Sequence, residues 1–391
     1  MNPVFEHYDL KMVSPSFEHP VVSLIIELDY LRKKKLSGST HPQIFFQLKD
    51  LFHTLESIGS ARIEGNRTTI IEYIETKIDP VKDKDIAEGI REILNMEKGM
   101  DFIDAHVKDH PINRAFVSEL HKLVVDGLSP SNEGDSTPGK FRSVNVKIGR
   151  AQHLPPDVSQ VQSYMDELFQ FINKGHEAKY DLLKTAIAHH RFVWAHPFRN
   201  GNGGTVRLFT YAMLVKSGFN LDQGRIVNPT AVFCHDRNQY FKNLSVADRG
   251  DEPSILNWCE YVLSGLKREI EKVDRLCQHD FLKEKILLPA IAISLDRKWV
   301  TDTEAKVLKV AAEKKVFQAN DIKHIFPGKI PADLSRVIRR LRERKLIVPE
   351  KDAPRKYLLS FHSSDLLRGV IIALDQAGFL PVQDKPIQEN K

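Results

Sequence analysis

Apolar residues recur at helical spacing through most of the first hundred positions. One such set follows the helix-start signal at residues 41–42, and its members are Ile44, Leu48, Leu51, Phe52 and Leu55. The pattern ends at residues 65–66, Gly-Asn, a typical stop signal. Further helices are predicted at about residues 85–107 and around residues 116–124, so the N-terminal part of the chain should be helical.

The pattern changes in the middle of the chain. Residues 126–139 are rich in turn-forming and polar residues and predict a loop. Val144, Val146 and Ile148 then alternate with polar residues, which is the period of a β-strand. A lone strand or hairpin among helices has an unpaired edge, which suits the addition of an extended segment from a partner. A short hairpin packed against the core is an equally open alternative.

Two more helices, at residues 156–172 and 181–194, lead into a polar loop that reads HPFRNGNGGTVR from His196 to Arg207. The helix that follows the loop is apolar nearly all round, which predicts a buried central helix. Three glycines in residues 201–204 let backbone N–H groups approach a ligand, and the N-terminal end of the next helix favours negative charge. The loop therefore predicts an anion site beside His196.

Residues 299–361 predict a separate small domain, with helices at 303–314, 320–325 and 332–345 followed by two strand-like runs. This order resembles a winged helix. Residues 321–345 hold eight basic and three acidic residues, and the difference equals the +5 formal charge of the whole chain. Arg336, Arg339 and Arg340 are therefore candidates for DNA contact, with a solvated helix face or a protein-contact module as the alternative.

The length of 391 residues favours two or three domains. Three isolated cysteines fit a reducing compartment better than disulfides or a structural zinc site. The start of the chain lacks a signal-peptide pattern, and its longest apolar run, residues 21–28, is too short to span a bilayer. We expect a cytoplasmic protein with no membrane partner, and the sequence leaves its oligomeric state open, a homodimer included.

Taken together, the 196–207 loop, the preceding GKFRSVNVKIG segment and the upstream SARIEGN segment resemble the Fic family of nucleotidyl transferases. The family motif is His-x-Phe-x-acid-Gly-Asn-Gly-Arg-x-x-Arg, and six positions match it: His196, Phe198, Gly201, Asn202, Gly203 and Arg207. The resemblance covers roughly residues 40–275. It implies a mainly α fold, a Fic-type helical bundle with a β-hairpin flap, to which the C-terminal winged-helix domain is added.

The resemblance also implies an activity, the transfer of AMP from ATP, with Mg²⁺ or Mn²⁺, to a Ser, Thr or Tyr hydroxyl of a target protein. His196 would be the general base. Asn202 and the amides of Gly201 and Gly203 would hold the α-phosphate, and Arg207 the γ-phosphate.

The extended segment with Val144, Val146 and Ile148 corresponds to the flap that aligns the target. Tyr240 stands where family members often line the base pocket.

The chain departs from the motif at two nucleotide-binding positions. Asn200 replaces the acid that holds the metal on the phosphates, and an amide oxygen is a poorer ligand for a hard cation. Gly204 replaces an arginine that clamps the phosphate chain. Arg199 and Arg150 are candidate substitutes for the lost cation.

SARIEGN resembles the family's inhibitory helix motif, in which a glutamate pairs with the second arginine of the loop. Ser60 and Glu64 match that motif, so we expect an ion pair between Glu64 and Arg207. Three readings stay open: an autoinhibited AMP transferase, a catalytically impaired nucleotide sensor that regulates DNA through its winged helix, and a transferase that uses another phosphate-linked donor.

These patterns divide the chain into five parts. We expect an N-terminal helical region with the inhibitory motif at 1–110, a Fic core domain at 111–275 and a connecting helix at 276–298. A winged-helix domain at 299–374 and a polar tail at 375–391 complete the chain.

Overall fold

The protein is mostly helical in a computed structural model that describes residues 4–33, 39–79, 86–149, 151–175, 177–219, 229–362 and 364–380. The chain divides into two compact units. The first, here called the core unit, comprises residues 1–35, 56–68 and 86–271. The second, the C-terminal unit, comprises residues 36–55, 69–85 and 272–391.

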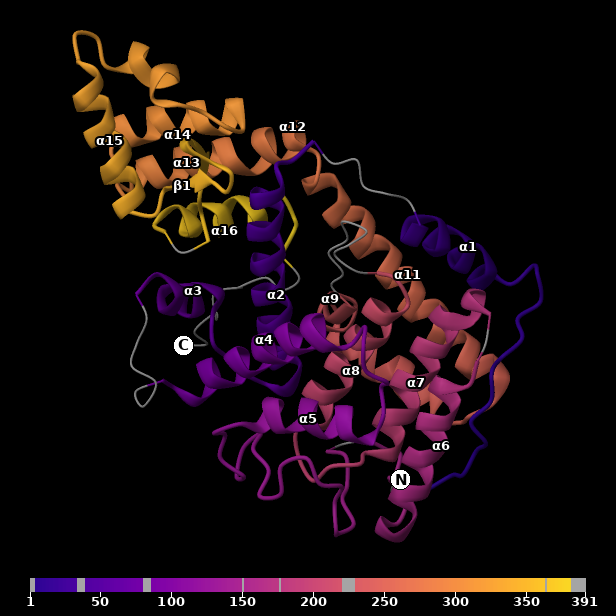
Figure 1. The fold of residues 1–391 in the computed structure, drawn as a ribbon. Helices are drawn as coiled ribbons and strands as arrows, with labels where there is room; N and C mark the ends of the chain where they lie inside the picture. The colour runs from indigo at the N-terminus through magenta and orange to yellow at the C-terminus, as the bar shows by residue number, and fades with distance from the viewer. Residues whose placement is uncertain are drawn as a thin grey trace, which may run out of the picture. The chain divides into compact units, whose positions relative to one another are not determined.

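Figure 1 labels most of the helices, and each begins and ends as follows. The elements in chain order are α1 (Pro20–Lys33), α2 (Pro42–Glu64), α3 (Ile70–Ile78), α4 (Glu88–His106), α5 (Arg114–Val125), η2 (Val158–Gln160), α6 (Val161–Asn173), η3 (Ala178–Tyr180), α7 (Asp181–Ala195), α8 (Asn202–Lys216), α9 (Pro229–Cys234), α10 (Arg237–Ala247), α11 (Glu252–Leu276), α12 (His279–Leu282), η5 (Lys283–Leu287), α13 (Leu288–Asp296), α14 (Asp302–Lys314), η6 (Ala319–Ile325), α15 (Pro331–Glu343), β1 (Ile347–Glu350), β2 (Ala353–Leu359) and α16 (Leu366–Gln376).

Helix α8 is the centre of the core unit. It packs against α4, α5 and α7 (Figure 1), and every residue from Gly204 to Val215 is buried. Gly99 of α4 permits a close approach, because a Cβ atom there would lie 2.3 Å from Leu208 Cδ1. The prediction of a buried central helix after the polar loop is confirmed, and burial on all sides fixes the position of that loop.

The predicted strand at residues 144–148 is wrong. The segment bends at residue 144, has no regular secondary structure at residues 145–148, and belongs to no ladder among the residues that the structure describes. Asn145 ties it to the chain near α6 instead, since its amide donates to Asp157 Oδ2 at 2.8 Å and its Oδ1 accepts from Val158 N–H at 2.7 Å. Alternation of apolar and polar residues specifies an extended backbone, whereas a strand also requires a paired neighbour.

The C-terminal unit contains the predicted order of three helices and a hairpin. The second helix, η6, is a 3₁₀ helix, and β1 pairs antiparallel with β2 in a register that places Ile347 opposite Leu359. Helix α16 packs on α13. This contact is close because a Cβ atom at Gly369 would lie 2.5 Å from the Ala290 carbonyl oxygen.

Helix α16 continues to Gln376, so the first two residues of the predicted polar tail are helical, and residues 381–391 lie outside the described part of the chain. None of the helices that the structure describes combines the length and the apolar character needed to cross a membrane.

Candidate active site

The loop predicted to be the site lies between α7 and α8 and is shaped by its own side chains. His196 ends α7 in the left-handed conformation, with φ of 47°. Gly201 caps α8 with φ of 68°, and a Cβ atom there would lie 2.7 Å from Val125 Cγ1. The Asn202 side chain closes the turn between them, because its Oδ1 accepts from Phe198 N–H and its Nδ2 donates to Phe198 O, both at 2.9 Å. Asn202 therefore holds the loop in shape.

His121 of α5 packs against the loop and bonds to it, a role that the sequence did not predict. Its ring stacks on Phe198 with 3.7 Å between the ring centroids and an interplanar angle of 1°. Its Nδ1 accepts from Gly139 N–H at 2.8 Å, which leaves the proton on Nε2, and that group donates to the Asn200 carbonyl at 3.1 Å. Burial lowers the pKa of His121, so it stays neutral in this role. An apolar-periodicity pattern gives no signal for such a residue.

Arg142 is a second residue that the sequence reading missed. It is 4% exposed, and its side chain donates to three carbonyls, those of His196 at 2.9 Å, Val144 at 3.0 Å and Pro156 at 2.6 Å. Its backbone N–H also donates to Pro197 O at 2.8 Å. Arg142 thus ties the start of the segment at 144–148 to the loop that carries His196.

His196 is held as a neutral imidazole. Its Nδ1 lies 3.4 Å from the Val193 carbonyl. Because a carbonyl only accepts, this contact places the proton on Nδ1 and leaves the lone pair of Nε2 available. Burial lowers the pKa of His196 to about 4, and the charge of Arg142 acts in the same direction. The ring is therefore ready to accept a proton at neutral pH.

The expected ion pair between Glu64 and Arg207 is present. Arg207 Nη2 lies 2.8 Å from Glu64 Oε1. The arginine also donates to Ser60, from Nε to Oγ at 2.7 Å and from Nη2 to the carbonyl at 3.1 Å. The Arg207 side chain is only 1% exposed, whereas that of Glu64 is 27% exposed. Burial lowers the Arg207 pKa, but the charge of Glu64 and its hydrogen bond, together with the charges of Tyr240 and Glu92, outweigh burial, and the net shift is upward.

The Glu64 carboxylate also lies at the start of α8. A Cβ atom at Gly203 would be 1.9 Å from Glu64 Oε1, so only glycine leaves room for the carboxylate there. The first N–H groups of a helix have no partner within the helix and favour an anion. Glu64 therefore supplies the anion at the predicted anion site.

Two further carboxyl groups belong to this charged environment. Burial raises the pKa of Glu92 and that of Glu133 to about 7. The charge of Glu64 raises both values further, and the charge of Arg207 opposes the shift. The single positive charge of Arg207 thus faces three carboxyl groups, those of Glu64, Glu92 and Glu133. This excess of carboxyl groups favours the binding of a cation or the protonation of one carboxyl.

Asn200 contacts the loop at 126–139 and holds it next to the loop that carries His196. Its Nδ2 contacts the carbonyl oxygens of Pro130 at 3.3 Å, Asn132 at 3.3 Å and Gly134 at 2.8 Å. Its backbone N–H lies 3.4 Å from Asp135 Oδ2. The amide group of Asn200 is thus used for donation to neighbouring carbonyls.

This arrangement does not fit a divalent cation at position 200. Only the neutral Oδ1 of Asn200 is left to act as a ligand. Across the described part of the chain, no group of three His, Cys, Asp or Glu side chains is placed to hold a metal ion. We derive no reaction step through a metal.

At position 204, where the motif has an arginine, neighbouring apolar side chains leave little room for a side chain. A Cβ atom at Gly204 would lie 2.9 Å from Val124 Cγ1 and 3.2 Å from Met96 Sδ. Of the candidate substitutes for the lost cation, Arg199 is exposed, and Arg150 lies outside the described residues. The position of the missing arginine is filled by apolar side chains of α4 and α5.

Tyr240 lies near Arg207 of the site, but its side chain is buried. The side chain is 2% exposed, and its hydroxyl lies 2.9 Å from His189 Nε2. His189 in turn contacts Thr210 of α8 through Nδ1 at 2.7 Å. Of the flap residues, Val144 is 47% exposed, while Val146 and Ile148 are half-buried.

The three candidate DNA-binding arginines are exposed on α15 in the C-terminal unit. Arg336 pairs with Asp333 at 2.7 Å. Arg344, one of the eight basic residues in 321–345, forms ion pairs with Glu304 at 2.5 Å and with Asp365 at 2.6 Å.

Comparison with known proteins relates this site to a known family. The model of the Fic/DOC family matches residues 111–214. Over 51% of its length the chain is 31% identical to a protein adenylyltransferase Fic of Drosophila yakuba, of which the match covers 37%. Over 49% of its length it is 28% identical to a protein of the same name from Nematostella vectensis, of which the match covers 42%. The chain thus spans less than half the length of these curated relatives.

A solved structure extends the likeness in fold beyond the matched residues. A Fic family protein from Desulfovibrio desulfuricans G20 superposes with a TM-score of 0.54 at 20% identity, covering 90% of this chain and 98% of that one. The residues that match the family model, 111–214, include α5 to α7, the loop from His196 to Gly201 and most of α8. Residues 111–214 are therefore a Fic/DOC domain.

Proposed function

We propose that the protein is a nucleotidyl transferase that moves AMP from ATP to a Ser, Thr or Tyr hydroxyl of a target protein, and that Glu64 inhibits this reaction. One observation carries the proposal. The Glu64 carboxylate pairs with the buried Arg207 and lies against Gly203 at the start of α8, next to the loop with His196.

The position of Glu64 indicates what the site binds without it. A buried arginine and a helix N-terminus both favour an anion with several oxygens, and a phosphate group meets this demand as well as a carboxylate does. Glu64 comes from another helix, α2, and fills this place from within the same chain. Its displacement leaves Arg207 free to bind a terminal phosphate.

The chemistry requires a base, and His196 supplies it. The hydroxyl oxygen of the target attacks the α-phosphorus, the bond from that phosphorus to the bridging oxygen breaks, and pyrophosphate leaves. The hydroxyl proton passes to Nε2 of His196, which is neutral because burial lowers its pKa to about 4. The backbone amides at the start of α8 stabilise the negative charge that develops on the phosphoryl oxygens.

The names of the curated relatives support the same reaction. Both are called protein adenylyltransferase Fic. The departures at Asn200 and Gly204 concern the groups that hold the phosphate chain, so the identity of the donor has to be tested along with the transfer itself. Mg²⁺ or Mn²⁺ would accompany ATP in the reaction mixture as its ordinary counter-ion.

The test uses the full chain, ATP labelled at the α-phosphate, and the variant Glu64→Gly. Glu64→Gln is the matched control, since it keeps the size of the side chain and removes its charge. We expect label on protein to increase by at least about tenfold in Glu64→Gly, with a smaller rise in Glu64→Gln. The combination of Glu64→Gly with His196→Ala should lose the label.

Label that persists without His196 would overturn the assignment of the base. If Glu64→Gly binds ATP but transfers nothing, AMP transfer from ATP is rejected, and nucleotides other than ATP are then tried as donors.

A second candidate function, nucleotide-dependent DNA binding, rests on the exposed face of α15. Arg336, Arg339 and Arg340 lie on this face and are exposed. Phosphate contacts make DNA affinity fall with salt, and each contact adds roughly one to the slope. Duplex DNA is titrated at several salt concentrations against the full chain and the variant with Arg339 and Arg340 both changed to Ala. Equal slopes for the two proteins would exclude this role for the arginines.

A further inference from the structure

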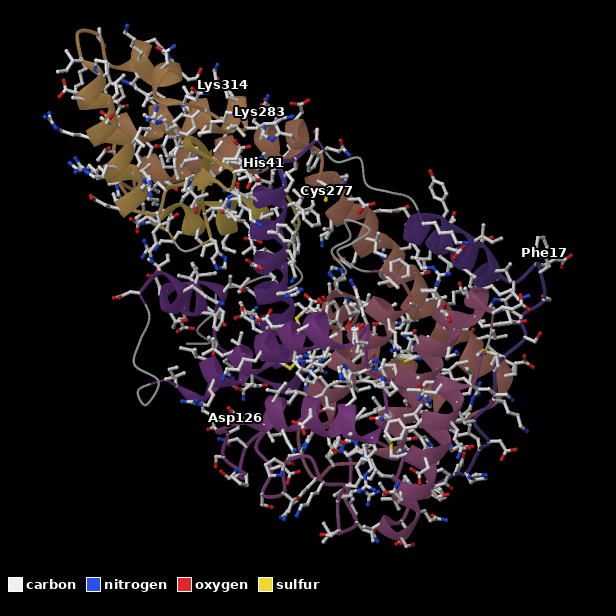
Figure 2. The ribbon with its side chains drawn as sticks, in the orientation of Figure 1. Phe17, His41, Asp126, Cys277, Lys283 and Lys314 are labelled. Carbon is white, nitrogen blue, oxygen red and sulfur yellow. The ribbon has the colours of Figure 1, made fainter. Side chains whose placement is uncertain are left out.

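A pocket of about 760 Å³ lies within the C-terminal unit, apart from the site described above. Its walls are the first turns of α2, the end of α15 and strand β1. This volume is in the range of small-molecule sites, which is roughly 300 to 1,000 Å³. His41, labelled in Figure 2, immediately precedes α2 and pairs with Glu350 at the end of β1 at 3.2 Å.

The wall formed by α2 is fixed to the hairpin by two glutamines. The Gln43 side chain donates to Pro349 O and accepts from Lys351 N–H, both at 3.2 Å. Gln47 repeats this pattern one turn later, donating to Leu359 O at 3.2 Å and accepting from Phe361 N–H at 2.8 Å. Each amide thus mimics the pairing of a neighbouring strand, so the pocket is preformed.

Three cations that have no salt bridge among the described residues line this pocket. Arg339, Arg342 and Lys345 are all exposed, and none of them has a salt bridge among the residues that the structure describes. Two carboxylates, Asp50 and Glu343, also line the pocket, and Asp50 lies 3.9 Å from His362. Counting only the Arg, Lys, Asp and Glu side chains, the net formal charge of the lining is +1. This charge suits one phosphate group better than a triphosphate.

The same pocket offers a surface for an aromatic ring. Phe46, on the α2 wall, is 52% exposed, which is uncommon for a phenylalanine. Val348 and Pro349 of β1 add half-buried apolar area to the lining. An exposed aromatic side chain beside exposed cations is the combination that binds nucleobases together with their phosphates.

We propose that this pocket binds a nucleoside monophosphate, whose base stacks on Phe46 and whose phosphate contacts Arg339, Arg342 and Lys345. The site is separate from the Fic/DOC domain, and its occupancy does not depend on the transfer reaction proposed above. Arg336 and Arg340 do not line it, so it also differs from the DNA-binding face as a whole.

The test is photolabelling of the full chain with 8-azido-AMP, followed by mapping of the labelled peptides. We expect label on residues 43–50 or 339–349, and unlabelled AMP should compete for it. The change of Arg342 and Lys345 together to Ala should weaken AMP binding by about tenfold, and Phe46→Ala should reduce labelling of the same peptides. Arg355→Ala is the matched control, because Arg355 is exposed on β2 and does not line the pocket.

The mapping separates this proposal from the function of the core unit. Label confined to residues 196–207, or equal labelling in the Arg342/Lys345 and Arg355 variants, would overturn it. Competition by duplex DNA but not by AMP would assign the cations to nucleic-acid binding instead and would also reject it. All four side chains to be changed are exposed, so the variants should fold, which circular dichroism checks.

Discussion

The side-chain amide of Asn200 lies 2.8 Å from the carbonyl oxygen of Gly134 and donates a hydrogen bond to it. Two more carbonyls of the same loop, those of Pro130 and Asn132, surround the amide at 3.3 Å. A carboxylate has no hydrogen to donate, so it would meet three carbonyl oxygens with a negative charge.

Restoring the acid of the motif should therefore loosen the loop. We expect Asn200→Asp to increase amide hydrogen exchange at residues 130–135 and to leave the protein without measurable Mn²⁺ binding by electron paramagnetic resonance. Asn200→Ala is the control, because it removes the donor without adding charge and should raise exchange less. Tight Mn²⁺ binding with unchanged exchange in Asn200→Asp would show that the position can still serve a metal.

Restoring the arginine at position 204 should fail for a different reason. The Cβ atom would meet Val124 and Met96 at 2.9 and 3.2 Å, and overpacking of this kind costs about 1 to 3 kcal/mol. We expect Gly204→Arg to lower the unfolding free energy by that amount without tightening ATP binding, as measured by denaturant titration and calorimetry. Adding Val124→Ala should recover part of the loss. Tighter ATP binding by Gly204→Arg alone would contradict this reading.

Ser60 should stabilise the site through Arg207. Its Oγ accepts from Arg207 Nε at 2.7 Å in a fully buried setting, and a hydrogen bond to a charged group contributes about 1.5 to 3 kcal/mol. We expect Ser60→Ala to lower the unfolding free energy by about 2 kcal/mol. Ser57→Ala is the matched control, because Ser57 is equally buried on α2 and its Oγ bonds, among the residues that the structure describes, only to Met100 Sδ, at 3.9 Å. Equal losses of unfolding free energy in the two variants would mean that the burial of the serine, and not its hydrogen bond to Arg207, determines the effect.

Glu56 should make stability depend on pH. It is 3% exposed, its Oε1 accepts from Thr230 N–H at 2.6 Å, and its Oε2 has no partner among the described residues. Burial raises the pKa of Glu56 to about 8. The folded state therefore holds a proton that the unfolded state has released, and stability falls as pH rises from the ordinary glutamate range towards about 8.

Glu56→Gln removes this dependence, because the amide stays neutral. We expect the melting temperature of Glu56→Gln to exceed that of the parent by an amount that grows between about pH 6 and about pH 8. Thermal melting followed by circular dichroism across this range gives the measurement. A constant difference at all pH values would show that Glu56 is already ionised in the folded protein.

The sequence alone determined the helices and the place of the site. Periodicity predicted α7 to within one residue and predicted that an apolar helix follows the loop, because an amphipathic or apolar stripe depends only on local spacing, although α8 already begins at Asn202, inside the predicted loop. The motif placed His196 beside a glycine-rich helix start, and the resemblance to a known family paired Glu64 with Arg207, as the structure shows. The order of helices and hairpin in the C-terminal unit also followed from local patterns.

Only the tertiary structure decided what the individual polar groups do. Asn200, Asn202, His121 and Arg142 all hold backbone segments. Asn200, His121 and Arg142 each reach a partner far away along the chain, where no local pattern registers it. The alternation at residues 144–148 predicted a strand, but a strand needs a partner and the fold supplies none among the described residues. Local spacing sets the conformation of a segment, whereas the donors, acceptors and packing around it are set by which distant segments the fold brings together.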